Sequence, residues 1–282
     1  MKVLVTGATG QLGWDVVKEL KKRNKECCGT GSKELDITAR EAVMRFIEDY
    51  RPDVVIHCAA YTAVDKAEDE PEKCRAVNVN GTAYIAEACR AVDAKMVYIS
   101  TDYVFGDDGN KLHEVDDPVH PLNVYGQTKW EGEEAVRRML QKYFIVRISW
   151  VFGEHGNNFV KTMLRLGQTH KEITVVADQF GAPTYTADLA PLLCDMIETD
   201  KYGTYHACNS GCCSWAEFAE EIFKDAKMDV KVIPIRTAEY PTKAKRPKNS
   251  RLDLSNLTNT CFYYLREWRD TLPDFLLTLE EK

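Results

Sequence analysis

Residues 6–13 read Thr-Gly-Ala-Thr-Gly-Gln-Leu-Gly, and this stretch decides the fold. The short apolar run 2–5 precedes it, and Val16, Val17 and Leu20 follow it with the spacing of a helix. Glycines in such a turn let the chain bend sharply, and they let a phosphate approach the backbone N–H groups at the helix start. A glycine-rich surface turn would not need a strand before it and a helix after it. The stretch therefore predicts a strand, a turn and a helix that bind a pyrophosphate.

Strand-like and helical patterns alternate along the first half of the chain. We expect strands at residues 3–5, 54–56, 96–99 and 144–148, and helices at 42–47, 76–91 and 125–140. This alternation predicts an α/β fold, a Rossmann-type doubly wound parallel sheet with helices on both faces. Thr6, Ala59, Thr101 and Trp150 each follow a strand. The four should therefore converge at the carboxyl ends of the strands, where a nucleotide would bind.

The second half of the chain is less regular. Helical patterns cover residues 157–166, 187–199 and 214–227, and short strand-like runs lie at 173–176 and 230–233. These pieces are too broken to continue the main sheet, so they predict a second, smaller α/β substrate lobe. We expect the nucleotide-binding domain to span residues 1–153 plus about 187–209, and the substrate lobe to span about 154–186 and 210–282.

A tyrosine and a lysine four residues apart follow the strand expected at 96–99. On a helix, Tyr125 and Lys129 lie on one face. An ammonium beside a phenol lowers the pKa of the phenol, and such a tyrosine can give a proton to a carbonyl that receives hydride. The spacing alone is common by chance, and it gains weight from Ser100 and Thr101 at the end of the preceding strand.

Composition narrows the function classes. The 282 residues are 44% hydrophobic and 29% charged, with a net charge of -7, which argues against a nucleic-acid or membrane-surface partner. No apolar run reaches the roughly 18 residues of a membrane span, and no signal-peptide pattern precedes the first strand. The ten cysteines contain no CxxC metal pair, so we expect no metal site. A reduced, cytoplasmic protein is the simplest expectation.

These motifs together resemble the extended short-chain dehydrogenase/reductase family over essentially the whole chain. The segments that carry the resemblance are 6–13, 35–38, 58–65, 78–80, 100–106, 125–129, 147–153, 179–184 and 246–253. Within the family, the chain is similar to reductases of nucleotide-linked 4-keto sugars. The resemblance implies NADPH-dependent reduction of the C4 keto group of dTDP-4-dehydro-L-rhamnose to dTDP-L-rhamnose. The implied partner is this nucleotide-diphosphate sugar, and the implied pathway is cell-wall polysaccharide synthesis.

The resemblance also implies roles for individual residues. Tyr125 would be the general acid, Lys129 would assist it and hold the nicotinamide ribose, and Thr101 would donate a hydrogen bond to the substrate carbonyl. Contacts to the cofactor would come from the glycine turn and the strand ends, namely Gly7, Gly10, Gln11, Leu12, Gly13, Asp36, Ile37, Ala59, Ala60, Tyr61, Asn78 and Ser100, besides Tyr125 and Lys129. Contacts to the substrate would come from Asp102, Val104 and Trp150.

Several of these assignments stay open at the level of the residues. Asp36 could cap a helix as well as contact adenine, Asn78 could only cap or bend a helix, and Trp150 could be a core residue. The basic run 243–251 could be a solvated face. Alternatively, Arg246 could hold the diphosphate of the substrate with two parallel hydrogen bonds.

The choice of cofactor is partly readable. An acid at the end of the second strand would bind a ribose 2′-hydroxyl and favour NADH, but residues 27–33 contain none. Ser32 or Lys33 could instead accept a 2′-phosphate. NADPH is therefore the expected cofactor, with NADH possible.

Two other functions compete with this one. The first is a related nucleotide-sugar epimerase or 4,6-dehydratase, but a dehydratase should have Thr-Asp-Glu where this chain has Tyr103 in third place. The second is a non-catalytic regulatory subunit on the same fold, and Thr101, Tyr125 and Lys129 together argue against it. The sequence leaves open whether the chain is a monomer or a homodimer.

Overall fold

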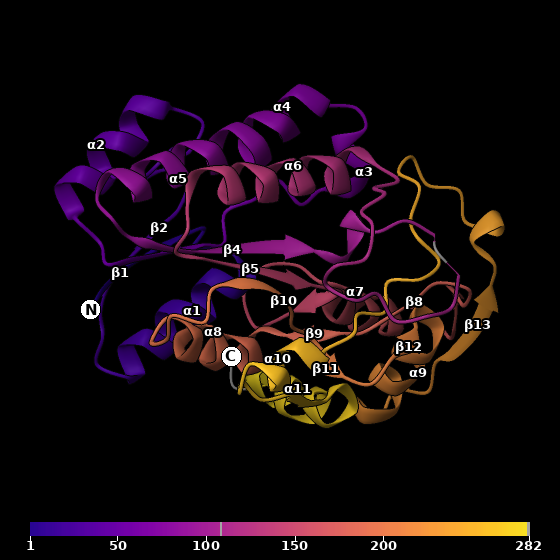
Figure 1. The fold of residues 1–282 in the computed structure, drawn as a ribbon. Coiled ribbons are helices and arrows are strands. Elements are labelled where there is room, and N and C mark those ends of the chain that lie inside the picture. Colours follow the sequence, from indigo (N-terminus) through magenta and orange to yellow (C-terminus); the bar gives the residue numbers. More distant parts are fainter. Residues whose placement is uncertain (108, 281–282) are drawn as a thin grey trace.

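The computed structural model describes residues 1–107 and 109–280. Figure 1 shows a central parallel sheet between two layers of helices, with a smaller lobe beside its carboxyl ends. One layer contains α2 (Arg40–Tyr50), α5 (Thr82–Ala91) and α6 (Val124–Met139), and the other contains α1 (Gln11–Lys22) and α8 (Thr186–Met196). Two short helices, α3 (Val64–Ala67) and α4 (Pro71–Arg75), lead into the first layer.

The central sheet has six strands among the described residues. They are β1 (Lys2–Thr6), β2 (Glu26–Thr30), β3 (Val54–His57), β4 (Lys95–Thr101), β5 (Tyr143–Ile148) and β10 (Gly203–His206). Their order is β10-β5-β4-β3-β1-β2, and every neighbouring pair is parallel. The winding reverses between β1 and β3, which opens a crevice at the carboxyl ends of these two strands. The expected Rossmann-type doubly wound sheet is thus confirmed.

Small sheets and helices make up the second lobe. The helices are α7 (Phe159–Gly167), α9 (Trp215–Asp225), α10 (Ser255–Asn259) and α11 (Leu272–Glu280). The strand pairs are β6 (Val151–Phe152) with β9 (Thr184–Tyr185), β7 (Glu172–Val176) with β13 (Lys231–Ile235), β8 (Phe180–Gly181) with β12 (Cys213–Ser214), and β11 (Asn209–Ser210) with β14 (Leu265–Glu267). An aromatic cluster that includes Phe152, Phe218, Trp268 and Phe275 holds these pieces together.

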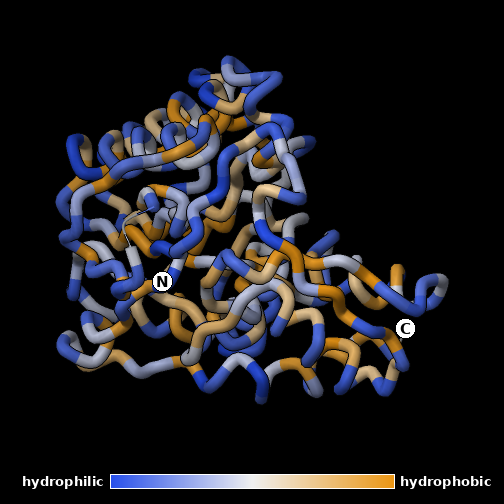
Figure 2. The backbone as a smooth tube through the Cα atoms, turned by 90° about the vertical axis from the view of Figure 1, so that its right-hand side faces the viewer, coloured by the Kyte–Doolittle hydropathy of each residue, from blue (hydrophilic) through white to orange (hydrophobic). Residues whose placement is uncertain are grey.

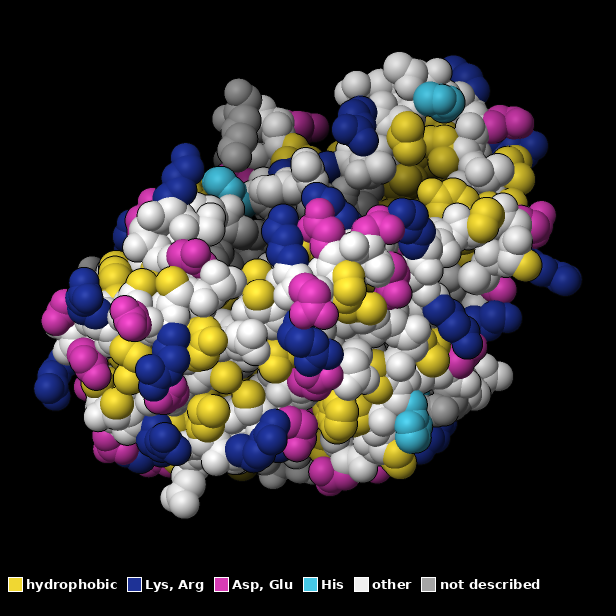
Figure 3. Space-filling view, turned by 90° about the horizontal axis from the view of Figure 1, so that it is seen from above, with side chains coloured by type: hydrophobic (Ala, Val, Ile, Leu, Met, Phe, Trp, Pro, Cys, Tyr) yellow, Lys and Arg dark blue, Asp and Glu magenta, His cyan; other side chains and the backbone are white. Residues whose placement is uncertain are grey.

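Apolar burial explains why the central strands form. Val54, Val55 and Ile56 of β3 are fully buried, as is expected for a strand covered by helices on both faces. In Figure 2 the hydrophobic stretches run largely through the interior, while many outer turns are hydrophilic. The face seen in Figure 3, over the layer with α5 and α6, carries acidic and basic side chains interspersed with small apolar areas.

Two glycines let helix α6 lie close to β4 and to the short helix Asp102–Val104 that follows it. A Cβ atom on Gly132 would lie 2.3 Å from Tyr98 Oη, and one on Gly126 would lie 2.1 Å from the carbonyl oxygen of Tyr103. Only residues without a side chain fit at these two points. Asn123 caps the helix, because its side chain accepts a hydrogen bond from the N–H of Gly126 at 2.8 Å. The sequence thereby fixes both the start of α6 and its distance from β4.

One expected helix has a different form. Residues 76–91 do not make one regular α-helix, because Ala76–Gly81 form a π-helical turn before α5 begins at Thr82. Such turns are frequent at functional sites, since they shift the side chains of one helical turn. Helices α10 and α11 have no counterpart in the sequence-based expectation. The four strands expected in the first half all form, with β2 as an addition that follows the helix after the glycine turn.

Candidate active site

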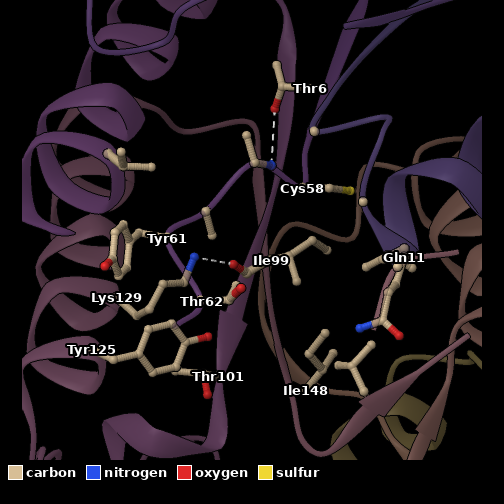
Figure 4. A pocket seen from close by; sticks show the side chains of 18 of the residues that line it. Thr6, Gln11, Cys58, Tyr61, Thr62, Ile99, Thr101, Tyr125, Lys129 and Ile148 are labelled. Carbon is tan, nitrogen blue, oxygen red and sulfur yellow. Dashed lines mark hydrogen bonds between the residues drawn. The ribbon is translucent and has the colours of Figure 1, made fainter. Parts of the chain in front are cut away.

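A cavity of about 780 Å³ lies at the carboxyl ends of β1, β3 and β4. Thr6, Ala59, Thr101 and Trp150 all line it, as expected from their positions after strands. Figure 4 shows Tyr125 and Thr101 on one side of this space and Gln11 on the other. Most of the residues assigned to the cofactor line the cavity, namely Gly7, Gly10, Gln11, Leu12, Ser32, Asp36, Ile37, Ala59, Ala60, Tyr61, Ser100, Tyr125 and Lys129.

The glycine turn has the backbone shape that a phosphate site requires. Gly7 has a φ of +69°, which a residue with a side chain rarely adopts, and a Cβ on it would lie 2.6 Å from the nitrogen of Ala59. Gly10 is the N-cap of α1 and has no side chain to cap the helix. Only backbone groups are therefore available to a ligand at this point. Gly13 does not line the cavity, but its missing side chain lets α1 touch the turn, because a Cβ there would lie 2.3 Å from the oxygen of Gly7. This turn fits the pyrophosphate of a dinucleotide.

The three residues expected to be catalytic meet at the other end of the cavity. Tyr125 and Lys129 come from α6, and Thr101 ends β4. The ammonium of Lys129 donates a hydrogen bond to the carbonyl oxygen of Ile99 at 2.6 Å and lies 4.1 Å from the ring centre of Tyr98. The hydroxyl of Thr101 donates to Asp102 Oδ1 at 2.9 Å and accepts from the N–H of Tyr103 at 3.2 Å.

Burial dominates the pKa values of this cluster. It raises the pKa of Tyr125 above its ordinary value, while a hydrogen bond with Thr101 works in the opposite direction. Burial lowers the pKa of Lys129 to about 7, against the favourable charge of Glu133. It raises the pKa of Asp102 to about 6, although hydrogen bonds with Ser250 and Thr101 work in the opposite direction. The expected lowering of the Tyr125 pKa by Lys129 is therefore wrong for this geometry, because the ammonium is directed at the backbone of β4.

Asn78 supports the cavity from behind. It is buried, it does not line the cavity, and it sits in the π-helical turn. Its side chain accepts a hydrogen bond from the N–H of Tyr61 at 2.8 Å and donates to the oxygen of Tyr61 and to Thr128 Oγ1, both at 3.1 Å. Asn78 thus links the loop after β3 to helix α6. The π-helical turn that contains Asn78 directs its side chain toward these partners.

The far end of the cavity contains the positions assigned to the adenosine. Asp36 does not cap α2, whose N-cap is Ala39. Asp36 Oδ1 instead accepts hydrogen bonds from the N–H and the hydroxyl of Thr38, at 2.9 and 2.7 Å. Ser32 lines the cavity next to Gly31, and the N–H of Gly31 donates to Glu34 at 2.8 Å. Glu34, the acidic residue nearest to Ser32 in the sequence, is therefore already bound to a backbone N–H.

Two tryptophans form the wall that faces the second lobe. Trp150 has a φ of +45°, and its ring stacks on Trp215 with ring centres 3.6 Å apart. Gly181 leaves room for the pair, because a Cβ on it would lie 2.6 Å from the ring of Trp150. Both rings line the cavity. Sequence reasoning missed Trp215, since a single tryptophan at the start of α9 carries no local signal of its position.

Two of the residues assigned to the substrate lie outside the lining. Val104 is fully buried in an apolar cluster with Phe105 and Leu252, which leaves its side chain no route to the cavity. Arg246 is bound instead to Asp65, with distances of 3.0 and 2.6 Å from its two terminal nitrogens to the two carboxylate oxygens. Although burial works against it, hydrogen bonds to Asp65 and to Tyr103 raise the pKa of Arg246.

The basic run is therefore folded onto the first domain. Lys243 pairs with Asp69 at 2.6 Å, and the side chain of Asn123 donates to the oxygen of Lys245 at 2.9 Å. Tyr103, which does line the cavity, links Arg246 to the edge of the site. The segment around Arg246 thus spans from the second lobe to α3 and α6.

Comparison with known proteins agrees with the fold. A family model described as the RmlD substrate binding domain matches residues 1–281. The dTDP-4-dehydrorhamnose reductase of Aggregatibacter actinomycetemcomitans is 42% identical over 97% of this chain and 97% of its own length. A crystal structure of a dTDP-4-dehydrorhamnose reductase from Clostridium acetobutylicum is 46% identical, with a TM-score of 0.97 over 99% of this chain and 100% of that chain.

A second solved structure bears on the cofactor. It is the dTDP-4-dehydrorhamnose reductase of Bacillus anthracis in complex with NADP, 45% identical, with a TM-score of 0.96 over 98% of this chain and 99% of that chain. The chain therefore belongs to the RmlD family, the dTDP-4-dehydrorhamnose reductases among the extended short-chain dehydrogenases/reductases.

Proposed function

We propose that this protein reduces the C4 keto group of dTDP-4-dehydro-L-rhamnose to give dTDP-L-rhamnose, with NADPH as the reductant. The observation that carries the proposal is a single cavity with the glycine turn at one end and Thr101, Tyr125 and Lys129 at the other. Relatives named for this activity match the chain over nearly their whole length, and one of them was solved with NADP.

The residues of the chain divide the work of the reaction. NADPH supplies the hydride when it is bound. Tyr125 delivers the proton to the carbonyl oxygen, and Thr101 stabilises the negative charge that develops there with a hydrogen bond. Lys129 holds the nicotinamide ribose with its ammonium. The cavity walls hold the reacting groups together, and proximity of this kind contributes much of the rate enhancement of enzymes.

The tryptophan wall is the proposed place of the sugar. Trp150 and Asp102 both line the cavity beside Thr101. A flat aromatic surface with a polar group beside it suits a deoxysugar, which has one apolar and one polar side. Arg246 would approach the diphosphate from the edge of the site through its contact with Tyr103. We propose no such contact for Val104, which is closed off in the core.

We propose a nucleotide-binding domain of residues 1–153 plus about 187–209, which includes β10 in the sheet. Among the residues that the structure describes, no helix is long and apolar enough to cross a bilayer. We propose a cytoplasmic protein, because all ten cysteines are free, as is usual in a reducing compartment.

The decisive experiment follows NADPH oxidation at 340 nm with and without the nucleotide-linked 4-keto sugar. The purified protein should oxidise NADPH only when the keto sugar is present. The variant Tyr125→Phe should lose about 10²–10⁴-fold in kcat while it binds NADPH nearly as well, because the phenol acts in the proton transfer. Tyr143→Phe, on β5, is the matched control. A Tyr125→Phe enzyme with more than half the wild-type kcat would contradict the assignment of the general acid.

A further inference from the structure

A buried carboxylate lies one helical turn beyond Lys129. Glu133 of α6 has no exposed surface, and four hydrogen bonds reach its two oxygens. Glu133 Oε1 accepts from Ser100 Oγ at 2.5 Å and from Arg147 Nε at 2.9 Å. Glu133 Oε2 accepts from Arg147 Nη2 and from Arg137 Nη2, both at 2.8 Å. A buried carboxylate that accepts four hydrogen bonds, three of them from arginines, is stabilised in its ionised form.

These bonds join the elements that carry the catalytic groups. Ser100 directly precedes Thr101 on β4, and Arg147 lies on β5, one strand further. Glu133 shares its helix face with Tyr125 and Lys129, since the three positions are spaced by four residues. The bond from Ser100 therefore fixes the end of β4, and with it Thr101, relative to the helix of the tyrosine and the lysine.

The arrangement of charges gives Glu133 a second effect. Arg147 and Lys129 are both 2% exposed, so Glu133 binds one buried cation directly and has a second one helical turn before it on α6. An arginine does not lose its proton in a protein, whereas a buried lysine readily does. If the negative charge were removed, Lys129 is the group that would respond. Of the charges that act on Lys129, Glu133 favours its ammonium most.

The other groups around Lys129 cannot replace that charge. They are the phenols of Tyr125 and Tyr98, the thiols of Cys58 and Cys74, and the ring of His57. Burial raises the pKa of both thiols, and it lowers the pKa of His57 to about 3, so these groups are neutral at pH 7. Burial likewise keeps both phenols protonated.

We propose that Glu133 is a positioning residue of this enzyme, which aligns Thr101 with the catalytic helix through Ser100 and keeps Lys129 charged. The inference rests on the reductase function proposed above. Glu133 touches neither substrate nor cofactor, and it acts through Ser100 and Lys129.

The test compares the pH dependence of kcat/KM for the keto sugar at saturating NADPH in the wild type, Glu133→Gln and Glu134→Gln. Glu134 is the matched control, because it also pairs with Arg137, at 2.7 Å, but is partly exposed and lies off the catalytic face. In Glu133→Gln the alkaline limb of the profile should move down by at least about one pH unit. Each unit lowers the protonated fraction of Lys129 about tenfold at a pH above the limb. Glu134→Gln should keep the wild-type limb.

A conservative variant separates charge from packing. Glu133→Asp keeps the charge with a shorter reach, so its limb should stay near that of the wild type while kcat falls. Equal loss of activity at every pH in Glu133→Gln, with the limb in place, would show a structural role only and overturn the proposal. If Glu133→Gln does not fold, Ser100→Ala removes only the bond from Ser100 to Glu133 and keeps the charge of Glu133, so it should lower kcat with the alkaline limb in place. An unchanged kcat in that variant would overturn the proposal.

Failure of the proposed function can be told apart from failure of this inference. If the wild type does not turn over the keto sugar, the function is wrong, and the role of Glu133 is then read from NADPH binding. The dissociation constant of NADPH, followed by its fluorescence, should weaken with rising pH at a lower pH in Glu133→Gln than in the wild type. The same pH dependence in both proteins would refute the inference.

Discussion

Gly13→Ala is the perturbation whose effect follows most directly from the geometry of the glycine turn. The added Cβ would lie 2.3 Å from the oxygen of Gly7 and 2.9 Å from the Cα of Ala8, and both contacts are backbone. An ordinary contact begins at 3.4 Å, so the turn and the start of α1 must separate by about 1 Å. Overpacking of this kind costs about 1–3 kcal/mol of stability. Loss of one hydrogen bond to a charged phosphate costs about 1.5–3 kcal/mol, or roughly 10–150-fold in affinity.

The assay is a titration of NADPH fluorescence, with a thermal melt of each protein. Gly13→Ala should bind NADPH at least about tenfold more weakly and melt several degrees lower, at about 2–4 °C per kcal/mol for a chain of this size. Gly167→Ala is the matched control for overpacking alone, because Gly167 does not line the cavity and its Cβ would lie 2.7 Å from Met228 Cε, so this variant should melt lower but bind NADPH as the wild type does. A folded Gly13→Ala protein that binds NADPH within about threefold of the wild type would refute the role of this turn in phosphate binding.

Three further outcomes follow from the site and its surroundings. Ser32→Asp should shift kcat/KM toward NADH, because a carboxylate repels a 2′-phosphate, and an unchanged preference would place the ribose elsewhere. Arg246→Ala should raise KM for the nucleotide sugar about 10-fold or more with little change in NADPH affinity, and an equal effect on both would indicate that its bond to Asp65 is only structural. Burial lowers the pKa values of His57 and His206 to about 3, so both take up protons on unfolding below pH 6.5. Stability should therefore be complete above pH 6.5 and decline toward pH 3, by about 1.4 kcal/mol per pH unit for each histidine, and denaturant titrations should show a shallower decline in His206→Asn.

Local spacing was enough to predict the parts of the site that lie close together in the sequence. The glycine turn needs only its own residues and the adjoining strand and helix, and Tyr125 and Lys129 need only the period of one helix. Glu133 continues the same four-residue spacing after Lys129. The residues around it in the sequence, however, do not show that Arg147 will bind it. A partner of that kind depends on the order of strands, which the spacing of residues along a helix does not contain.

Long-range contacts account for what the sequence could not show. The bond of Arg246 to Asp65 joins positions 181 residues apart, and the stack of Trp150 on Trp215 joins two lobes. The pKa of Tyr125 is raised mainly by burial, which depends on packing across the whole fold. Tyr103 and Val104 are neighbours in the sequence, yet only Tyr103 lines the cavity. The packing of the short helix Asp102–Val104 decides which of the two side chains faces it.

The place of β10 in the sheet has a consequence for how the chain folds as it leaves the ribosome. β10 pairs with β5, although 54 residues, among them the first segment of the second lobe, lie between Ile148 and Gly203. Until residue 206 has emerged, β5 presents an unpaired edge, the kind of surface at which nascent chains stick to one another. The nucleotide-binding domain therefore cannot complete itself before residues 154–186 of the second lobe have been synthesised. Translation speed through residues 149–206, and chaperones that shield the open edge during that interval, should decide how much of the protein reaches the native state.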